Sequence, residues 1–282
     1  MDGPVVFLDS GIGGIPYCRN FSLRNPGEPV VYTADRAFFP YGKRDQGELA
    51  AIVTELVKKI RAAVEPKIVV VACNTATVSA LPVLRETFPD LPFVGTVPAV
   101  KPAVTESRSG VVGVLGTGRT IQDPYIAGLA AAYGNNCRIR GIAAPELVEF
   151  IEYRYSRAEN HEKREMALTY INKFRAAGVD AIVLGCTHFL FLLDEFRREA
   201  EPDIRIYDSL EGISRRVEHL LDADGKKLRA AGGGTGGKTL AGERGRAADN
   251  LFLVTGEAEP EPSWSHWAGY LGFRLSRLGD IP

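Results

Sequence analysis

The chain is poor in the residues that build disulfide scaffolds and metal centres. Its 282 residues include four cysteines and four histidines, and the cysteines form no C-x-x-C pair. A long chain with so few thiols is not a disulfide scaffold, and a zinc cluster would have few ligands to draw on. We therefore expect no metal site, and we expect free thiols in a reducing cytoplasm at Cys18, Cys73, Cys137 and Cys186.

Features that would direct the chain to a membrane, a secretion route or nucleic acid are also missing. No apolar run is long enough to cross a bilayer, which takes about 18 residues. The first residues do not form a basic start followed by an apolar core, so we expect a cytoplasmic protein. The 34 Lys and Arg residues balance 35 Asp and Glu residues. This balance argues against a general nucleic-acid surface.

Two cysteines stand at the ends of strongly apolar runs. The run Ile-Val-Val-Val-Ala leads to Cys73, and Ala-Ile-Val-Leu-Gly leads to Cys186. In open α/β sheets the carboxyl ends of the strands are where ligands bind. Two thiols delivered in the same way suggest one site with a sulfur on each side, an arrangement suited to moving protons across a flat intermediate. Cys18 and Cys137 match no such pattern, and we interpret them as structural.

Apolar runs alternate along the chain with segments of helical spacing. This alternation predicts an α/β fold with parallel sheets. Each of the two cysteine strands is preceded by a strand that ends in a Gly-rich turn, which suggests two similar lobes. The expected strands are 4–8, 29–33, 68–72, 92–95, 110–115, 181–184 and 204–207. The expected helices are 46–64, 78–87, 127–133, 147–153, 160–176 and 190–200.

Residues 222–250 break the pattern. They are rich in Gly, Ala, Lys and Arg and lack apolar periodicity, which is typical of a flexible surface insertion. Residues 232–239 satisfy the phosphate-loop pattern G-x-x-x-x-G-K-[ST]. That loop needs a strand before it and a helix after it. The segment before the pattern is charged and does not resemble a strand, and the segment after it has almost no apolar residues. We therefore interpret the match as an accident of low-complexity sequence.

Several motifs, in order along the chain, resemble those of glutamate racemases. Residues 9–14 read D-S-G-I-G-G, and residues 32–42 resemble the pattern Y-x-x-D-x-x-x-x-P-Y-G. The two cysteine motifs read A-C-N-T-A and G-C-T-H. The resemblance extends to G-V-L-G-T with Thr120, to 145–152, to 252–255 and to 268–272. It covers nearly the whole chain except the insertion. The chain departs from the family at Gly116, at Phe189-Leu190 and at Leu210.

The resemblance implies a fold and a reaction. The fold would have two similar lobes, each a mostly parallel sheet flanked by helices, with the active site between them. Residues 1–98 and 209–282 would form the first lobe and 99–208 the second. The reaction would be cofactor-independent interconversion of L- and D-glutamate, which supplies D-glutamate for peptidoglycan. Members of the family often form homodimers, and the sequence leaves the assembly of this chain open.

The same resemblance implies roles for single residues. A thiolate at one of Cys73 and Cys186 would remove the α-proton, and the opposite thiol would return a proton to the other face. The helix after each cysteine would favour the thiolate through its N-terminal dipole. Asp9, Glu152 and His188 would tune the proton transfers. The implied substrate-binding residues are Asp9, Ser10, Pro40, Tyr41, Gly42, Asn74, Thr75, Thr117, Thr120, Thr187 and His188.

Alternatives stay open at this point. A racemase of aspartate or another amino acid is one, although related aspartate and hydantoin racemases commonly carry Glu where this chain has His188. A hydrolase could use Cys186 as nucleophile with a histidine base. A two-lobed amino-acid-binding protein would leave the paired cysteines without a task. A pyridoxal phosphate enzyme would need a lysine in a convincing site, which the sequence does not offer. The hydroxyl and amide residues could also serve as turns and helix caps.

Overall fold

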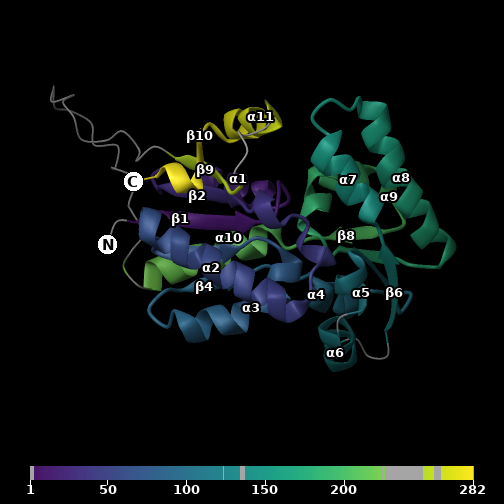
Figure 1. The fold of residues 1–282 in the computed structure, drawn as a ribbon. Helices are drawn as coiled ribbons and strands as arrows, with labels where there is room; N and C mark the ends of the chain where they lie inside the picture. The colour runs from purple at the N-terminus through teal and green to yellow at the C-terminus, as the bar shows by residue number, and fades with distance from the viewer. Residues whose placement is uncertain are drawn as a thin grey trace, which may run out of the picture.

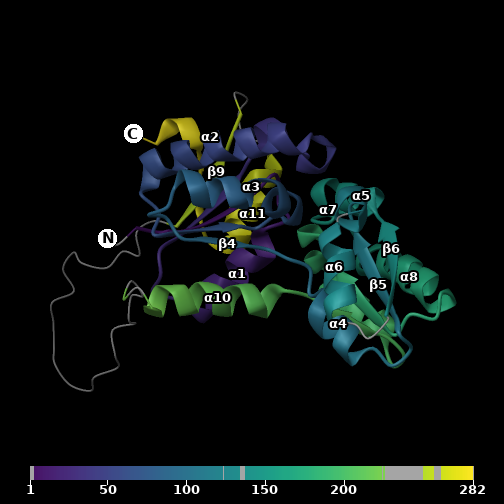
Figure 2. The ribbon, with the colours of Figure 1, turned by 90° about the horizontal axis from the view of Figure 1, so that it is seen from below.

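The computed structural model describes residues 3–122, 124–133, 137–223, 225, 250–256 and 262–281. In this part of the chain two parallel sheets lie side by side, each flanked by helices (Figures 1 and 2). The predicted α/β fold with two mostly parallel sheets is confirmed. The six-stranded sheet takes strands from both ends of the chain, and the four-stranded sheet takes its strands from the middle.

The larger sheet is buried on both faces. Its strands are β1 (Val5–Asp9), β2 (Val30–Ala34), β3 (Ile68–Val71), β4 (Phe93–Gly95), β9 (Leu251–Val254) and β10 (Arg274–Arg277). Their order across the sheet is β10-β9-β2-β1-β3-β4. Because both faces are covered, β1 is apolar at successive positions and not at alternate ones. Val5 and Phe7 enter one core, and Val6 and Leu8 enter the core on the opposite face.

Helices cover both faces of this sheet. They are α1 (Ile15–Arg24), α2 (Gln46–Val64), α3 (Asn74–Thr87), α10 (Leu210–Ala223) and α11 (Pro262–Leu271), with short 3₁₀ turns η1 (Arg36–Phe38), η2 (Tyr41–Lys43) and η4 (Leu278–Asp280). The α2 helix starts where the Asp45 carboxylate accepts hydrogen bonds from the backbone N–H groups of Gly47 and Glu48. Its apolar stripe, which includes Leu49, Val53 and Ile60, packs into the second core.

The smaller sheet has the order β6-β5-β7-β8, and its neighbouring strands are parallel. Its strands are β5 (Val111–Gly116), β6 (Arg138–Ala143), β7 (Ala181–Leu184) and β8 (Arg205–Tyr207). Its helices are α4 (Val100–Glu106), α5 (Gly118–Gln122), α6 (Pro124–Tyr133), α7 (Pro145–Tyr153), α8 (Asn160–Ala176) and α9 (Leu193–Ala200), with the 3₁₀ turn η3 (Thr187–Leu192).

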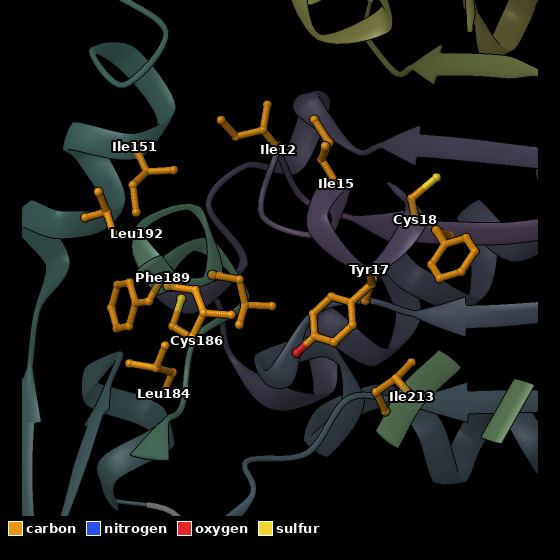
Figure 3. Close-up of a cluster of buried hydrophobic side chains, with 14 of the residues drawn as sticks. Ile12, Ile15, Tyr17, Cys18, Ile151, Leu184, Cys186, Phe189, Leu192 and Ile213 are labelled. Atoms are coloured by element: carbon orange, nitrogen blue, oxygen red, sulfur yellow. The ribbon is translucent and has the colours of Figure 1, made fainter. Parts of the chain in front are cut away.

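One apolar core runs across the junction between the two sheets. Ile12, Ile15 and Tyr17 from the first part belong to the same buried cluster as Ile151 and Phe189 from the second. Figure 3 shows these side chains on the two sides of the junction, with Cys186 among them. The junction is therefore packed as an interior, and it holds the sheet edges in a defined relation.

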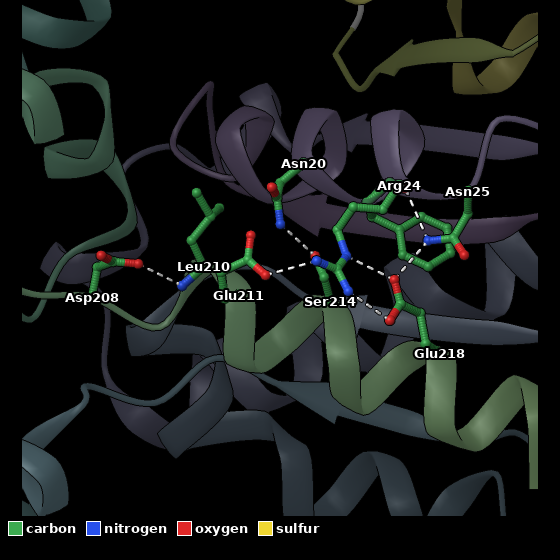
Figure 4. A network of polar contacts seen from close by, with 9 residues as sticks. Asn20, Arg24, Asn25, Asp208, Leu210, Glu211, Ser214 and Glu218 are labelled. Carbon is green, nitrogen blue, oxygen red and sulfur yellow. Dashed lines mark hydrogen bonds and ion pairs between the residues drawn. The ribbon is translucent and has the colours of Figure 1, made fainter.

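Helix α10, which follows the second crossing between the parts, is tied to α1 (Figure 4). Arg24 donates hydrogen bonds to the carboxylates of Glu211 and Glu218. The Asn20 amide donates to the Ser214 hydroxyl at 2.8 Å. These contacts hold the returning chain against the first sheet.

The structure changes some of the expected boundaries. The helices predicted at 46–64 and 160–176 are confirmed. The helix after Cys73 starts at Asn74 and not near residue 78, because Cys73 itself occupies the N-cap position. After Cys186 the chain first forms the 3₁₀ turn η3, and α9 starts at Leu193 and not near residue 190.

None of the described helices is long and apolar enough to cross a membrane. The phosphate-loop-like segment at 232–239 lies outside the described residues.

Candidate active site

The carboxyl edges of both sheets meet at one cavity of about 740 Å³. Ser10 follows β1 and Cys73 follows β3, whereas Thr117 follows β5 and Cys186 follows β7. This is the edge where parallel α/β sheets bind ligands. The predicted residues that line the cavity are Ser10, Pro40, Tyr41, Gly42, Cys73, Asn74, Thr75, Thr117, Thr120, Cys186, Thr187 and His188. The two other predicted residues, Asp9 and Glu152, lie behind this lining.

Cys73 stands between β3 and the first turn of α3. Its backbone is extended, and its side chain is buried. Burial raises the pKa of the Cys73 thiol well above its ordinary value, and the nearby charge of Asp9 raises it further. Backbone N–H groups at the start of α3 oppose that rise. Cys73 is therefore a thiol at neutral pH.

Cys186 has a histidine beside it. The Cys186 Sγ lies 3.7 Å from Nδ1 of His188, and Nε2 of His188 lies 2.6 Å from Oε1 of Glu152. Burial lowers the pKa of His188, but the hydrogen bonds to Cys186 and Glu152 outweigh it and raise the pKa well above 6.5. The imidazole is thus a charged donor between a sulfur and a carboxylate, and such hydrogen bonds are the strong ones.

Glu152 also joins the two parts of the molecule. Its Oε1 accepts a hydrogen bond from the backbone N–H of Ile12 at 2.9 Å, in the Gly-rich turn after β1. A Cβ added to Gly11 would stand 2.1 Å from this oxygen, and one added to Gly13 would stand 2.5 Å from Nδ1 of His188. The turn must therefore be free of side chains at both positions, because the His188–Glu152 pair occupies the space.

Asp9 is fully buried at the end of β1. Its carboxylate accepts hydrogen bonds from the backbone N–H of Gly11 at 2.7 Å and from the Thr187 hydroxyl at 3.4 Å. Burial raises the pKa of Asp9 to about 6, although the charge of His188 lowers it. Asp9 consequently exchanges its proton close to neutral pH.

Hydrogen bonds cross the cavity floor and brace its wall. The Asn74 amide donates to the backbone carbonyl of Gly185 at 2.7 Å, which links the two cysteine segments. The Tyr41 hydroxyl donates to the Asp35 carboxylate at 2.6 Å, and the Thr255 hydroxyl donates to the other oxygen at 2.5 Å. The Pro40–Gly42 segment is thus fixed from behind by Asp35.

Comparison with known proteins decides the family. The family model for Asp/Glu/Hydantoin racemase matches residues 20–213. The chain belongs to the Asp/Glu/hydantoin racemase family. It is 39% identical to the glutamate racemase of Sphingopyxis alaskensis over 224 residues, which cover 78% of this chain and 83% of that protein. It is also 39% identical to the glutamate racemase of Treponema pallidum over 214 residues, covering 76% and 80% of the two chains.

The solved structures agree with this assignment. The crystal structure of Escherichia coli glutamate racemase, in complex with L-glutamate and the activator UDP-MurNAc-Ala, matches with a TM-score of 0.79 at 28% identity. The match covers 98% of this chain and 97% of that one. Cys73 and Cys186 lie within residues 20–213, the segment that the family model matches.

The structure also places residues in the cavity wall that sequence reasoning missed. Arg36, Phe39 and Lys43 flank the predicted Pro40–Gly42 segment. Val148, Glu149 and Tyr153 come from α7, which also carries Glu152. A signal for Val148 was available, because residues four apart on a helix share a face. The remaining lining residues that were not predicted are Gly118, Ala143, Pro145 and Gly185.

Proposed function

We propose that this chain is a cofactor-independent glutamate racemase of the cytoplasm, which supplies D-glutamate for peptidoglycan. The observation that carries the proposal is the pair of thiols that line one cavity from two different sheets, Cys73 and Cys186. Each thiol has acid–base groups nearby, Asp9 on one side and the His188–Glu152 pair on the other. The relatives named above that carry the same architecture are glutamate racemases.

The two thiols would act in turn. One sulfur, as thiolate, takes the proton from the α-carbon and becomes a thiol. The opposite sulfur gives its proton to the other face of the same carbon and becomes a thiolate. The C–H electron pair stays on carbon between the two steps, so no oxidant or reductant is needed. The reverse reaction uses the same groups with their roles exchanged.

The α-carbon is a weak acid, and the site must stabilise negative charge on the substrate as the proton leaves. Neutral hydroxyl and amide donors line the cavity at Asn74, Thr75 and Thr187. Fixed donors of this kind stabilise developing charge without reorganisation. The charged imidazole of His188 supports proton transfer at Cys186, and Asp9, with its pKa near 6, supports proton transfer at Cys73.

We also propose that residues 1–98 and 209–282 form one lobe and residues 99–208 the other. The strands of the larger sheet fall within 5–95 and 251–277, and those of the smaller sheet within 111–207. The cavity between the sheet edges then takes one cysteine from each lobe.

Exchange with solvent deuterium tests the function. The purified protein is incubated in deuterated water with L-glutamate, and separately with D-glutamate, without added cofactor. Circular dichroism follows inversion and NMR follows deuterium at the α-carbon. We expect inversion with deuterium in the product, and loss of inversion in Cys73→Ser and Cys186→Ser. Cys137→Ser is the matched control, because Cys137 is a thiol outside the cavity. Full racemisation by Cys73→Ser or by Cys186→Ser would contradict the two-thiol mechanism.

The same assay separates the rivals. An aspartate racemase would turn over aspartate faster than glutamate. A cysteine hydrolase would form a covalent acyl-enzyme at Cys186 and would not need Cys73.

A further inference from the structure

The segment that brings Pro40, Tyr41 and Gly42 into the cavity wall has little packing of its own. Within residues 36–48, all of which the structure describes, Tyr41 is the one buried side chain. Its ring belongs to the second core, on one face of the larger sheet. The turn η1, which precedes it, contains no buried residue. The position of this part of the wall therefore depends on how Tyr41 is held.

The Tyr41 hydroxyl is held by two residues that stand behind the wall. It donates to Oδ2 of Asp35, and Oδ1 of the same carboxylate accepts a hydrogen bond from the Thr255 hydroxyl at 2.5 Å. The Thr255 oxygen also accepts a hydrogen bond from the backbone N–H of Ala37 at 3.1 Å. Burial raises the pKa of Asp35, and the hydrogen bonds from the two hydroxyls oppose this rise. Both hydroxyls thus favour the charged carboxylate that binds them.

The hydroxyl of Thr255 is itself fixed by the larger sheet. Thr255 directly follows β9, and its backbone N–H donates to the carbonyl of Ala34 at the end of β2. The next residue of that strand end, Asp35, donates its backbone N–H to the carbonyl of Asp9 at 2.8 Å. The ends of β1, β2 and β9 are therefore joined by hydrogen bonds at the point where the cavity-wall segment begins.

We propose that Thr255 is a positioning residue for substrate binding: through Asp35 it orients Tyr41 and, with it, the cavity wall formed by residues 40–42. The inference rests on the proposed racemase function. Thr255 is not part of the cavity lining that the structure describes, so it acts through other residues and not on the substrate itself. Loss of its hydroxyl would displace the wall and leave Cys73 and Cys186 in their surroundings. The effect should therefore appear in KM more than in kcat.

Steady-state kinetics on Thr255 variants test the proposal. Thr255→Val removes the hydroxyl with little change in shape, and Thr255→Ser keeps it. Thr169→Val is the matched control, because the Thr169 hydroxyl lies on the exposed face of α8 and donates to the carbonyl of Glu165. We expect Thr255→Val to raise KM for glutamate about three- to tenfold, the size expected when water partly replaces a hydrogen bond to a charged group. The kcat should stay within about twofold, and Thr255→Ser and Thr169→Val should behave as the wild type.

Hydrogen exchange in the ligand-free protein provides a readout that does not need racemisation. The backbone N–H groups of Lys43 and Arg44 donate to the carbonyls of Pro40 and Tyr41. Thr255→Val should accelerate deuterium uptake at these two amides, because the segment opens more often once its anchor is lost. Thr255→Ser should leave the uptake unchanged. Mass spectrometry of the peptide that contains them measures the rate, and a peptide from α8 is the internal reference.

Tyr41→Phe removes the other end of the same contact, and it tests the proposal even if Thr255→Val does not fold. It should raise KM by a similar factor and accelerate the same exchange. The double variant of Tyr41→Phe with Thr255→Val should be little worse than either single variant, because both changes act through the Asp35 carboxylate.

Several results would overturn the inference. One is an unchanged KM in Thr255→Val or in Tyr41→Phe. Another is a raised KM that Thr255→Ser shares, or effects of Thr255→Val and Tyr41→Phe that simply add in the double variant. If the wild type does not racemise glutamate, the proposed function fails instead, and the exchange rates still decide whether Thr255 holds the segment. The two failures are therefore distinguishable.

Discussion

At the scale of single residues, the two sides of the site hold their protons differently. His188 is kept charged by two acceptors, the Cys186 sulfur and the Glu152 carboxylate. Asp9 is kept partly protonated by burial, because its pKa rises to about 6. The side of Cys186 therefore offers an imidazole whose pKa is raised by its partners, and the side of Cys73 offers a carboxyl group that changes state near neutral pH. Such a difference between the two sides suits a reaction in which protons are transferred in both directions, from Cys73 toward Cys186 and the reverse.

The buried carboxyl of Asp9 predicts a pH dependence of stability. Unfolded Asp9 loses its proton near 3.8 and folded Asp9 near 6. Between these values the folded protein holds a proton that the unfolded chain has released, so the free energy of unfolding falls as the pH rises from about 4 to 6. The difference corresponds to on the order of 3 kcal/mol. Denaturant unfolding of the wild type and Asp9→Asn from pH 4 to 7 measures it, because the variant lacks this contribution.

Asp180 provides the control for this experiment. Burial raises its pKa, but hydrogen bonds from Ser107, Ser109 and the backbone of Arg108 outweigh it and lower the pKa to about 2. Its contribution to stability is therefore present above about 4 and is lost only as the pH falls toward 2. The difference between the wild type and Asp180→Asn should stay flat from pH 4 to 7. A flat difference for Asp9→Asn as well would contradict the prediction.

At the scale of elements, the helices and strands that could be predicted from the sequence are those with a strongly apolar pattern. The β-branched run before Cys73 and the helical stripe of 46–64 each have a buried face, and both are confirmed. Strand β6, which reads R-I-R-G-I-A, was missed because its two isoleucines stand three positions apart and not at alternate positions. It also lies at the edge of its sheet and is largely exposed. Its pairing with β5 is made by backbone groups, which leave no pattern in the side chains.

The site shows the same division. Cys73 and Cys186 were predictable because each ends an apolar strand. Arg36 and Tyr153 were not, since they meet only after the two sheets are placed together. The hydrogen bond between Glu152 and His188 could not be predicted either, because the two residues are 36 positions apart along the chain.

One buried ion pair fixes two elements of the larger sheet. Nζ of Lys67, directly before β3, lies 2.5 Å from Oε2 of Glu28 in the turn before β2, and the two side chains are 0% and 1% exposed. Glu28→Leu would leave the ammonium without this carboxylate, so we expect it to lower the free energy of unfolding by about 3–5 kcal/mol. Chemical denaturation measures this loss.

The double variant Glu28→Leu with Lys67→Met tests whether the cost comes from the unpaired charge. It should be more stable than either single variant, because neither member of the ion pair is then buried without the other. If the losses in unfolding free energy of the two single variants simply add in the double variant, Glu28 and Lys67 are not coupled.

At the scale of the whole molecule, the cavity lies between two sheets that share a core, and hydrogen bonds near the cavity also join the two sheets. Asn74 binds the carbonyl of Gly185 at the floor. Arg119 of α5 donates to the backbone carbonyl of Arg44, just after η2, and so joins the opposite wall to the segment that carries Pro40, Tyr41 and Gly42. The position of this segment over the cavity therefore depends on a side chain from the other sheet.

Removal of that side chain should loosen the cavity without touching the thiols. We expect Arg119→Ala to raise KM by up to about tenfold, because a hydrogen bond from a charged donor contributes about 1.5–3 kcal/mol and part of it is replaced by water. The kcat should change less, since Cys73, Cys186 and His188 keep their partners. Small-angle X-ray scattering of the ligand-free variant should show a larger radius of gyration than the wild type, and saturating glutamate should reduce the difference. An unchanged KM together with an unchanged radius would mean that the shared core alone sets the distance between the two sheets.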